Sequence, residues 1–73
     1  MRSIETQLAI LDNIRSSGAI VMIKLDGERT NEVITVLIDF PRPTEKKAIR
    51  LNGDNLNTLL ESLIAEYEKL YGK

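Results

Sequence analysis

The first apolar pattern along the chain has the period of an α-helix. Over Ser3–Ser17, apolar residues recur at intervals of three and four, the spacing that gives a helix one buried face. Ser3 is a suitable N-cap, and Glu5 lies in the first turn, where the helix dipole favours an acid. Gly18 follows as the residue that ends the helix in a left-handed conformation. The expected inward face consists of Ile4, Leu8, Leu11 and Arg15, with Ile10 and Ile14 beside them.

Two β-branched runs follow this helix. Ala19–Leu25 is almost continuously apolar, and Asp26-Gly27 after it is a common turn pair. The second run, Val33–Phe40, stops at Pro41, which has no backbone N–H to donate to a sheet. We therefore predict two neighbouring strands joined as a hairpin.

The hairpin has two possible registers. If Asp26-Gly27 formed the whole loop, Ile23 would lie opposite Thr30, so apolar surface would face polar residues. A polar loop over Asp26–Asn31 instead places Ile23 opposite Ile34, and we predict this register because it pairs apolar residues with each other. Its full set of pairs is Leu25 with Glu32, Ile23 with Ile34, Val21 with Val36 and Ala19 with Ile38.

The C-terminal half contains a third strand and the longest helix. Over residues 46–51, Lys47, Ile49 and Leu51 alternate with Lys46, Ala48 and Arg50, which predicts a half-exposed strand after the connection Pro41–Thr44. Apolar positions then follow the helical period over Asp54–Tyr71, with Asp54 or Asn52 as the expected cap. The sequence thus predicts an α+β fold of order α-β-β-β-α: one domain over residues 1–73, with a three-stranded antiparallel meander packed by two helices.

The second strand is apolar on both of its faces. A strand with one face in water should alternate, yet Val33–Ile38 is apolar at all positions except Thr35. Either one helix covers each face of the sheet, or both helices lie on one side and leave an apolar face uncovered. An uncovered apolar face usually marks an interface, so we expect a homodimer. The residues expected to carry self-association are Ile20, Met22, Val33 and Leu37.

Composition limits how so short a chain is stabilised. It has 73 residues, no cysteine and no histidine, so disulfides and the usual zinc ligand sets are excluded. A core of this size rarely supplies more than about 3–5 kcal/mol, which leaves oligomerisation as the expected further stabilisation. No apolar run approaches the length of a membrane span, and the N-terminus lacks the apolar segment of a signal peptide. We expect a cytoplasmic protein.

The available side chains favour binding over catalysis. Without histidine or cysteine, acid–base and nucleophilic chemistry would rest on carboxylates, lysine, tyrosine, serine and threonine. Asp26, Glu28 and Glu32 share one loop, but their spacing is not that of an EF-hand. Asp39 and Glu45 are the one carboxylate pair considered for acid–base chemistry, and nothing in the sequence brings them together. We expect no enzyme activity, cofactor, metal or small-molecule substrate.

Basic residues concentrate in the C-terminal half. Four of the ten lysines and arginines fall within residues 42–50, although the formal net charge is only −1. Such a cluster can steer a partner, and lysine on an edge strand also protects it from aggregation. The residues expected to contact a partner are Arg29, Arg42, Lys46, Lys47 and Arg50.

One stretch resembles a known family. Val36–Phe40, a polar loop with Lys46-Lys47, and then Ala48–Asn52 leading into a leucine-rich helix are similar to the C-terminal half of the PC4-type (positive cofactor 4) single-stranded DNA-binding domains. The resemblance covers about half the chain and implies phosphate contacts by Lys46, Lys47 and Arg50. In contrast to that family, this chain begins with a helix.

Two functional hypotheses follow. The first is a small non-enzymatic regulatory or accessory module that acts as a homodimer and binds another protein. The alternative is a single-stranded nucleic-acid-binding protein that uses a basic sheet face. Salt separates them, because phosphate contacts weaken steeply as salt rises whereas an apolar protein interface barely changes.

Overall fold

The computed structural model describes residues 1–72. Its elements in chain order are α1 (Ile4–Ser16), β1 (Ile20–Leu25), β2 (Ile34–Asp39), β3 (Ile49–Gly53) and α2 (Leu56–Tyr71). The strands form one antiparallel sheet of order β1-β2-β3. The predicted α+β class and the order α-β-β-β-α are therefore confirmed.

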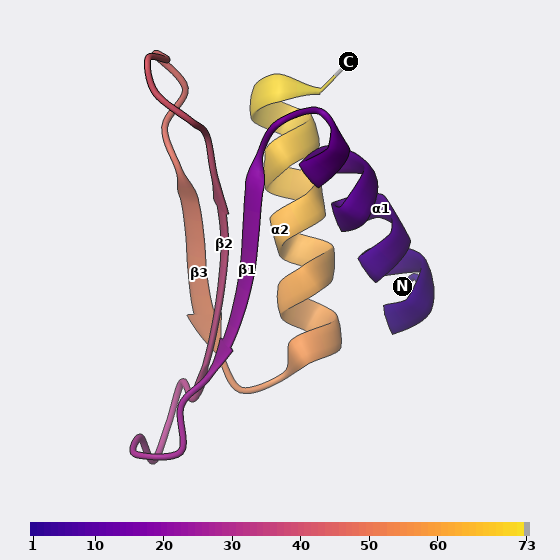
Figure 1. Ribbon diagram of the computed structural model, residues 1–73. Helices are drawn as coiled ribbons and strands as arrows, with labels where there is room; N and C mark the ends of the chain where they lie inside the picture. Colours follow the sequence, from indigo (N-terminus) through magenta and orange to yellow (C-terminus); the bar gives the residue numbers. More distant parts are fainter. Residues whose placement is uncertain (73) are drawn as a thin grey trace.

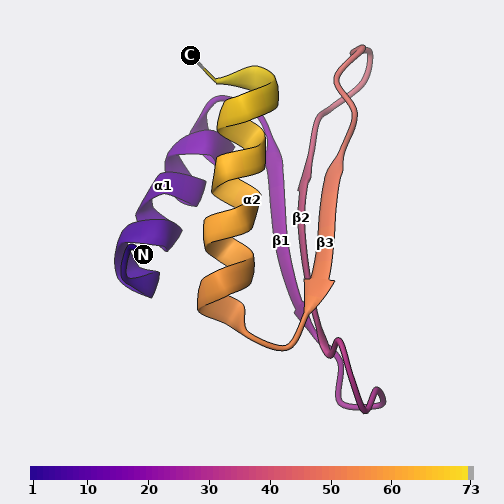
Figure 2. The same cartoon turned by 180° about the vertical axis from the view of Figure 1, so that it is seen from behind.

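Both helices lie on the same side of the sheet (Figure 1). α2 packs across β2 and β3, while α1 packs beside α2 and against β1. The reverse view shows the same arrangement, with β3 in front of the other two strands and the helices again together on one side (Figure 2). Of the two layer arrangements that the sequence left open, the fold adopts the one in which no described helix covers the second sheet face.

The core fills the space between the helices and the sheet. Ile38 and Val36 of β2 are fully buried beneath Leu60, Leu63 and Ile64 of α2, which are also inaccessible to solvent. Burying one such side chain stabilises a fold by roughly 1.5–3 kcal/mol before the entropy of ordering is subtracted. The centre of the molecule is therefore the contact between β2 and α2.

The inward face of α1 differs from the predicted one. It consists of Gln7, Leu11 and Ile14. Leu11 was predicted to face inward, but Ile4, Leu8 and Arg15 are exposed. The helix buries an amide in place of available apolar side chains because α2 offers polar partners to Gln7, as described below.

Capping residues define the boundaries of the two helices. The Ser3 hydroxyl accepts a hydrogen bond from the Thr6 N–H at 3.2 Å, which confirms the predicted cap of α1. Gly18 has a φ of 111°, a left-handed conformation that favours glycine. α2 is capped by Asn55, whose side chain accepts from the Thr58 N–H at 2.9 Å, and not by either residue predicted for this role.

The hairpin register is displaced by two residues from the predicted one. Ile23 lies opposite Val36 and Leu25 opposite Ile34. The loop is longer than expected, because the Val33 N–H donates to Asp54 Oδ1 at 3.2 Å and Glu32 adopts a positive φ of 49°. A displacement of two residues keeps the side chains within β1 and β2 on their predicted faces, since side chains alternate along a strand.

Candidate functional site

The sheet face opposite the helices is covered by neither described helix. We call it the open face, and its side chains come from alternate residues of all three strands: Ile20, Met22, Lys24, Thr35, Leu37, Asp39, Arg50 and Asn52. Met22, Leu37 and Arg50 form one cross-strand row. In the next row, the Thr35 hydroxyl donates to Asn52 Oδ1 at 2.8 Å. The open face is thus apolar towards one end and polar towards the other.

Three of the four predicted self-association residues come together on this face. Met22 lies directly opposite Leu37, and Ile20 precedes Met22 on the same side of β1. Ile20 is 53% exposed and Met22 46% exposed. Val33 is placed differently: it lies outside β2, is half-buried and packs against the core. The apolar patch of the open face therefore consists of Ile20, Met22 and Leu37.

The predicted basic residues do not form one patch. Arg42, Lys46 and Lys47 lie in the loop between β2 and β3, while Arg50 lies on β3 and faces away from the helices. Arg29 lies in the β1–β2 loop, at the opposite end of the sheet (Figure 1), and its Nη2 is 3.8 Å from Glu32 Oε1. The structure thus brings together three of the five residues, with Arg50 on the adjoining strand.

The β2–β3 loop is longer than predicted. β3 begins at Ile49, so Lys46 and Lys47, which were predicted to lie in the strand, belong to the loop. A cavity of about 480 Å³ lies at this loop. It is lined by Asp39, Phe40, Arg42, Thr44, Glu45, Lys46, Lys47 and Ala48. The lining carries both signs of charge, so it does not favour an anion through charge alone.

Aromatic residues hold this loop against the end of α2. The Tyr71 hydroxyl accepts from the Lys47 N–H at 2.9 Å and donates to the Lys47 carbonyl at 3.0 Å. The ammonium of Lys46 lies 5.3 Å from the ring centre of Phe40 and 5.4 Å from that of Tyr71, within cation–π range. Phe40 and Tyr71 meet edge to face, with ring centres 5.0 Å apart. One terminal helical residue therefore fixes the loop that carries three of the predicted partner contacts.

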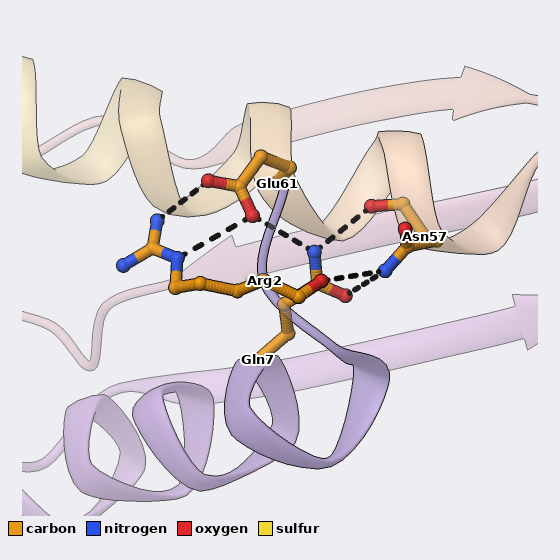
Figure 3. A network of polar contacts seen from close by, with 4 residues as sticks. All are labelled: Arg2, Gln7, Asn57 and Glu61. Atoms are coloured by element: carbon orange, nitrogen blue, oxygen red, sulfur yellow. Dashed lines mark hydrogen bonds and ion pairs between the residues drawn. The ribbon is translucent and has the colours of Figure 1, made fainter.

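A polar network at the interface of the two helices was not predicted from the sequence (Figure 3). Gln7 is fully buried, and its amide donates to the Asn57 carbonyl at 3.1 Å and to Glu61 Oε1 at 2.9 Å. Asn57 donates back to Gln7 Oε1 at 2.8 Å and to the Arg2 carbonyl at 3.1 Å. These bonds join the start of α1 to the first half of α2. Buried polar groups are stable only when they are paired, and here they are.

An ion pair between Arg2 and Glu61 completes the network and lowers the pKa of Glu61. Arg2 Nη2 lies 2.8 Å from Glu61 Oε2. The hydrogen bond from Arg2, followed by that from Gln7, lowers the pKa of the Glu61 carboxyl from its usual 4.5 to about 2. The role of this group is to hold α1 in place, because its hydrogen-bonding atoms are occupied by neighbouring side chains.

Asp26 and Asp39, two of the candidate catalytic or metal-binding carboxylates, contact residues that are adjacent or close to them in sequence. Asp26 Oδ1 accepts from the Glu28 N–H at 3.0 Å, and Asp26 Oδ2 lies 3.8 Å from Lys24 Nζ. Asp39 Oδ1 accepts from the N–H of Phe40 at 2.8 Å. Within residues 1–72, no three carboxylate side chains gather closely enough to form a metal site.

Comparison of the chain with protein-family models, with curated proteins and with solved structures finds no match. Neither of the two described helices has the length and apolar character that crossing a bilayer requires.

The sequence contained one partial signal for the missed network. Gln7, Leu11 and Ile14 have the spacing of one helical face, and Asn57 and Glu61 are four residues apart on α2. This spacing could have placed Gln7 on the buried face, where the prediction had Ile4 and Leu8, but it gave no indication that a polar partner lay on the other helix.

Proposed function

We propose that the protein is a small non-enzymatic regulatory or accessory module that acts as a homodimer and binds another protein. The observation that carries the protein-binding part of this proposal is the apolar patch of Ile20, Met22 and Leu37 on a sheet face that neither helix covers. The homodimer rests on the small size of the core, which association with a second copy would stabilise. Exposed apolar surface next to basic residues is typical of a surface that becomes buried in a complex.

The surroundings of the patch indicate what kind of protein partner fits. Arg50 borders Leu37 in the same row, and Lys24 follows Met22 on the same side of β1. Arg42, Lys46 and Lys47 lie beyond the end of the sheet in an anchored loop. An apolar centre with a basic border favours a partner surface that is apolar in its centre and acidic around it.

The aromatic residues favour a protein over single-stranded nucleic acid. Phe40, Tyr67 and Tyr71 cluster with one another and with the core, on the helix side of the sheet. Single strands are usually held by stacking bases on exposed aromatic rings. The described open-face side chains include no ring, so that face could hold a single strand only through charge.

The experiment combines mass and salt dependence. Light scattering after size exclusion, from low micromolar to about a hundred micromolar, should give about 16.4 kDa, twice the 8.2 kDa of one chain. A steady 8.2 kDa would contradict the homodimer. Titration of a fluorescent single-stranded oligonucleotide at 50 and 200 mM salt should show no specific binding; tight binding that weakens steeply with salt would favour the alternative.

A further inference from the structure

The two edges of the sheet differ in how well they are protected from pairing. β3 has five residues, among them Arg50, Asn52 and Gly53, and it follows two lysines. β1 has six residues, Ile-Val-Met-Ile-Lys-Leu, with Lys24 as its single charge. Native proteins usually protect edge strands with charges, proline, bulges or a covering element. β1 is the outer strand nearest the viewer in Figure 1, and no described strand pairs with its outer side.

The hydrogen-bond pattern shows which backbone groups of β1 are unpaired. The Asp26 N–H donates to the Val33 carbonyl at 2.8 Å, so Asp26 directs its backbone groups towards β2. The N–H and C=O groups of successive residues in a strand point alternately to one side and to the other. The N–H and C=O groups of Val21, Ile23 and Leu25 therefore point outward, away from β2.

The side chains of these same three residues are incompletely buried. Val21 and Ile23 are half-buried, although the residues opposite them, Ile38 and Val36, are fully buried. Leu25 points towards the helix side and is 70% exposed. The outer side of β1 thus combines free ladder groups with apolar side chains that lack neighbours.

A second copy of β1 matches this edge in one register. In an antiparallel pair centred on Ile23, Val21 lies opposite Leu25 of the other copy, and the two Ile23 residues face each other. Every directly opposed pair on the helix side is then apolar, and the backbone groups of all three residues form ladder bonds. On the open face, Met22 lies opposite Lys24, and Ile20 lies opposite Asp26.

Neighbouring registers match less well. Centring on Lys24 would place two like charges directly opposite each other, which is destabilising. Centring on Met22 pairs Val21 with Ile23 and leaves Leu25 opposite Ala19, outside the strand. The net charge of −1 per chain opposes association only weakly.

Size also favours the edge over the open face as the contact between copies. Three strands about 4.8 Å apart and six residues long at about 3.3 Å each give a face of roughly 300 Å². A standard interface buries about 800 Å² per partner. Strand addition relies less on area, because main-chain hydrogen bonds supply much of its affinity.

We propose that a second copy of this chain pairs antiparallel with β1 about Ile23, so that the two sheets form one six-stranded sheet. This inference rests on the proposed homodimer and specifies its contact. The two open faces then lie on the same side, because a two-fold axis that pairs antiparallel strands is perpendicular to the sheet. Both apolar patches remain free, side by side, for the protein partner.

Two substitutions, one at the β1 edge and one at the centre of the open face, test this geometry. Leu25→Pro removes an N–H that points away from β2 and replaces the exposed leucine side chain. The hydrogen bonds between β1 and β2 are retained, because the Leu25 N–H makes none of them. Leu37→Lys alters the centre of the open face and leaves the β1 edge unchanged. Sedimentation equilibrium should show a dimer dissociation constant raised at least tenfold by Leu25→Pro and changed less than threefold by Leu37→Lys, with circular dichroism confirming that both variants are folded.

The outcomes separate the contact geometry from the proposed function. Dissociation by Leu37→Lys but not by Leu25→Pro would overturn the β1 pairing and leave the homodimer intact. A wild-type monomer at every concentration would overturn both proposals.

Cysteine cross-linking gives an independent measurement if Leu25→Pro fails to fold. The natural chain has no cysteine, so an equal mixture of Met22→Cys and Lys24→Cys chains should form a mixed disulfide faster than either variant forms one alone. Faster cross-linking of Met22→Cys alone, or of Leu37→Cys, would overturn the register.

Discussion

The hydroxyl of Tyr71 is a specific target for testing how the β2–β3 loop is held. Tyr71→Phe removes the acceptor of the Lys47 N–H and the donor to the Lys47 carbonyl, and leaves the aromatic packing against Phe40 in place. A net hydrogen bond contributes about 0.5–1.5 kcal/mol, and these two are exposed, so water replaces them in part. We therefore expect a loss of about 1 kcal/mol, carried by local opening of the loop.

Amide hydrogen exchange followed by NMR measures this effect directly. A local loss of about 1 kcal/mol corresponds to roughly fivefold faster exchange at the Lys47 amide, with little change at β2 amides. Tyr67→Phe is the matched control, because the Tyr67 hydroxyl makes no hydrogen bond among the described residues. Equal protection of Lys47 in the wild type and in Tyr71→Phe would refute this account of the loop.

Three further changes test the core, a helix cap and the polar network. Ile38→Ala should cost about 2–5 kcal/mol, comparable to the whole stability of so small a domain, so circular dichroism should show a largely unfolded chain at 25 °C. Asn55→Ala removes the bond to the Thr58 N–H and should cost about 1 kcal/mol in urea unfolding. Because the pKa of Glu61 is lowered to about 2, its interactions contribute fully above its unfolded pKa of 4.5 and are lost as the pH falls from 4.5 towards 2. Glu61→Gln should remove this part of the acid dependence of the melting temperature, and an identical acid profile in wild type and variant would contradict it.

The hydrophobic pattern predicted the elements because each one has a clear period. α2 repeats apolar residues without interruption, and β1 and β2 are β-branched runs bounded by turn residues. The register in which the two strands pair was harder to predict. The register depends on how long the loop is, and the loop is fixed by a contact between Val33 and Asp54, which are far apart in sequence.

The polar contacts between elements were the hardest features to predict. The inward placement of Gln7 depends on Asn57 and Glu61, which approach it only after the chain folds. Similarly, alternation placed Lys46 in a strand, whereas the ring of Tyr71 near the chain end holds its loop in another conformation. A single-sequence pattern reports which face a residue prefers, but not which distant side chain will satisfy it.

The incomplete burial of β1 links the fold to the proposed assembly. α2 covers β2 and β3, and α1 is the one described helix that packs against β1. Val21 and Ile23 are consequently half-buried although they point to the core side. Among residues 1–72 no further element covers this edge, and in the proposed dimer a second β1 supplies both ladder partners and apolar neighbours. Folding and pairing are then linked, because the dimer completes the same core that stabilises each chain. In the proposed dimer the open face takes no part in the pairing, and its exposed apolar residues stay available for the proposed protein partner.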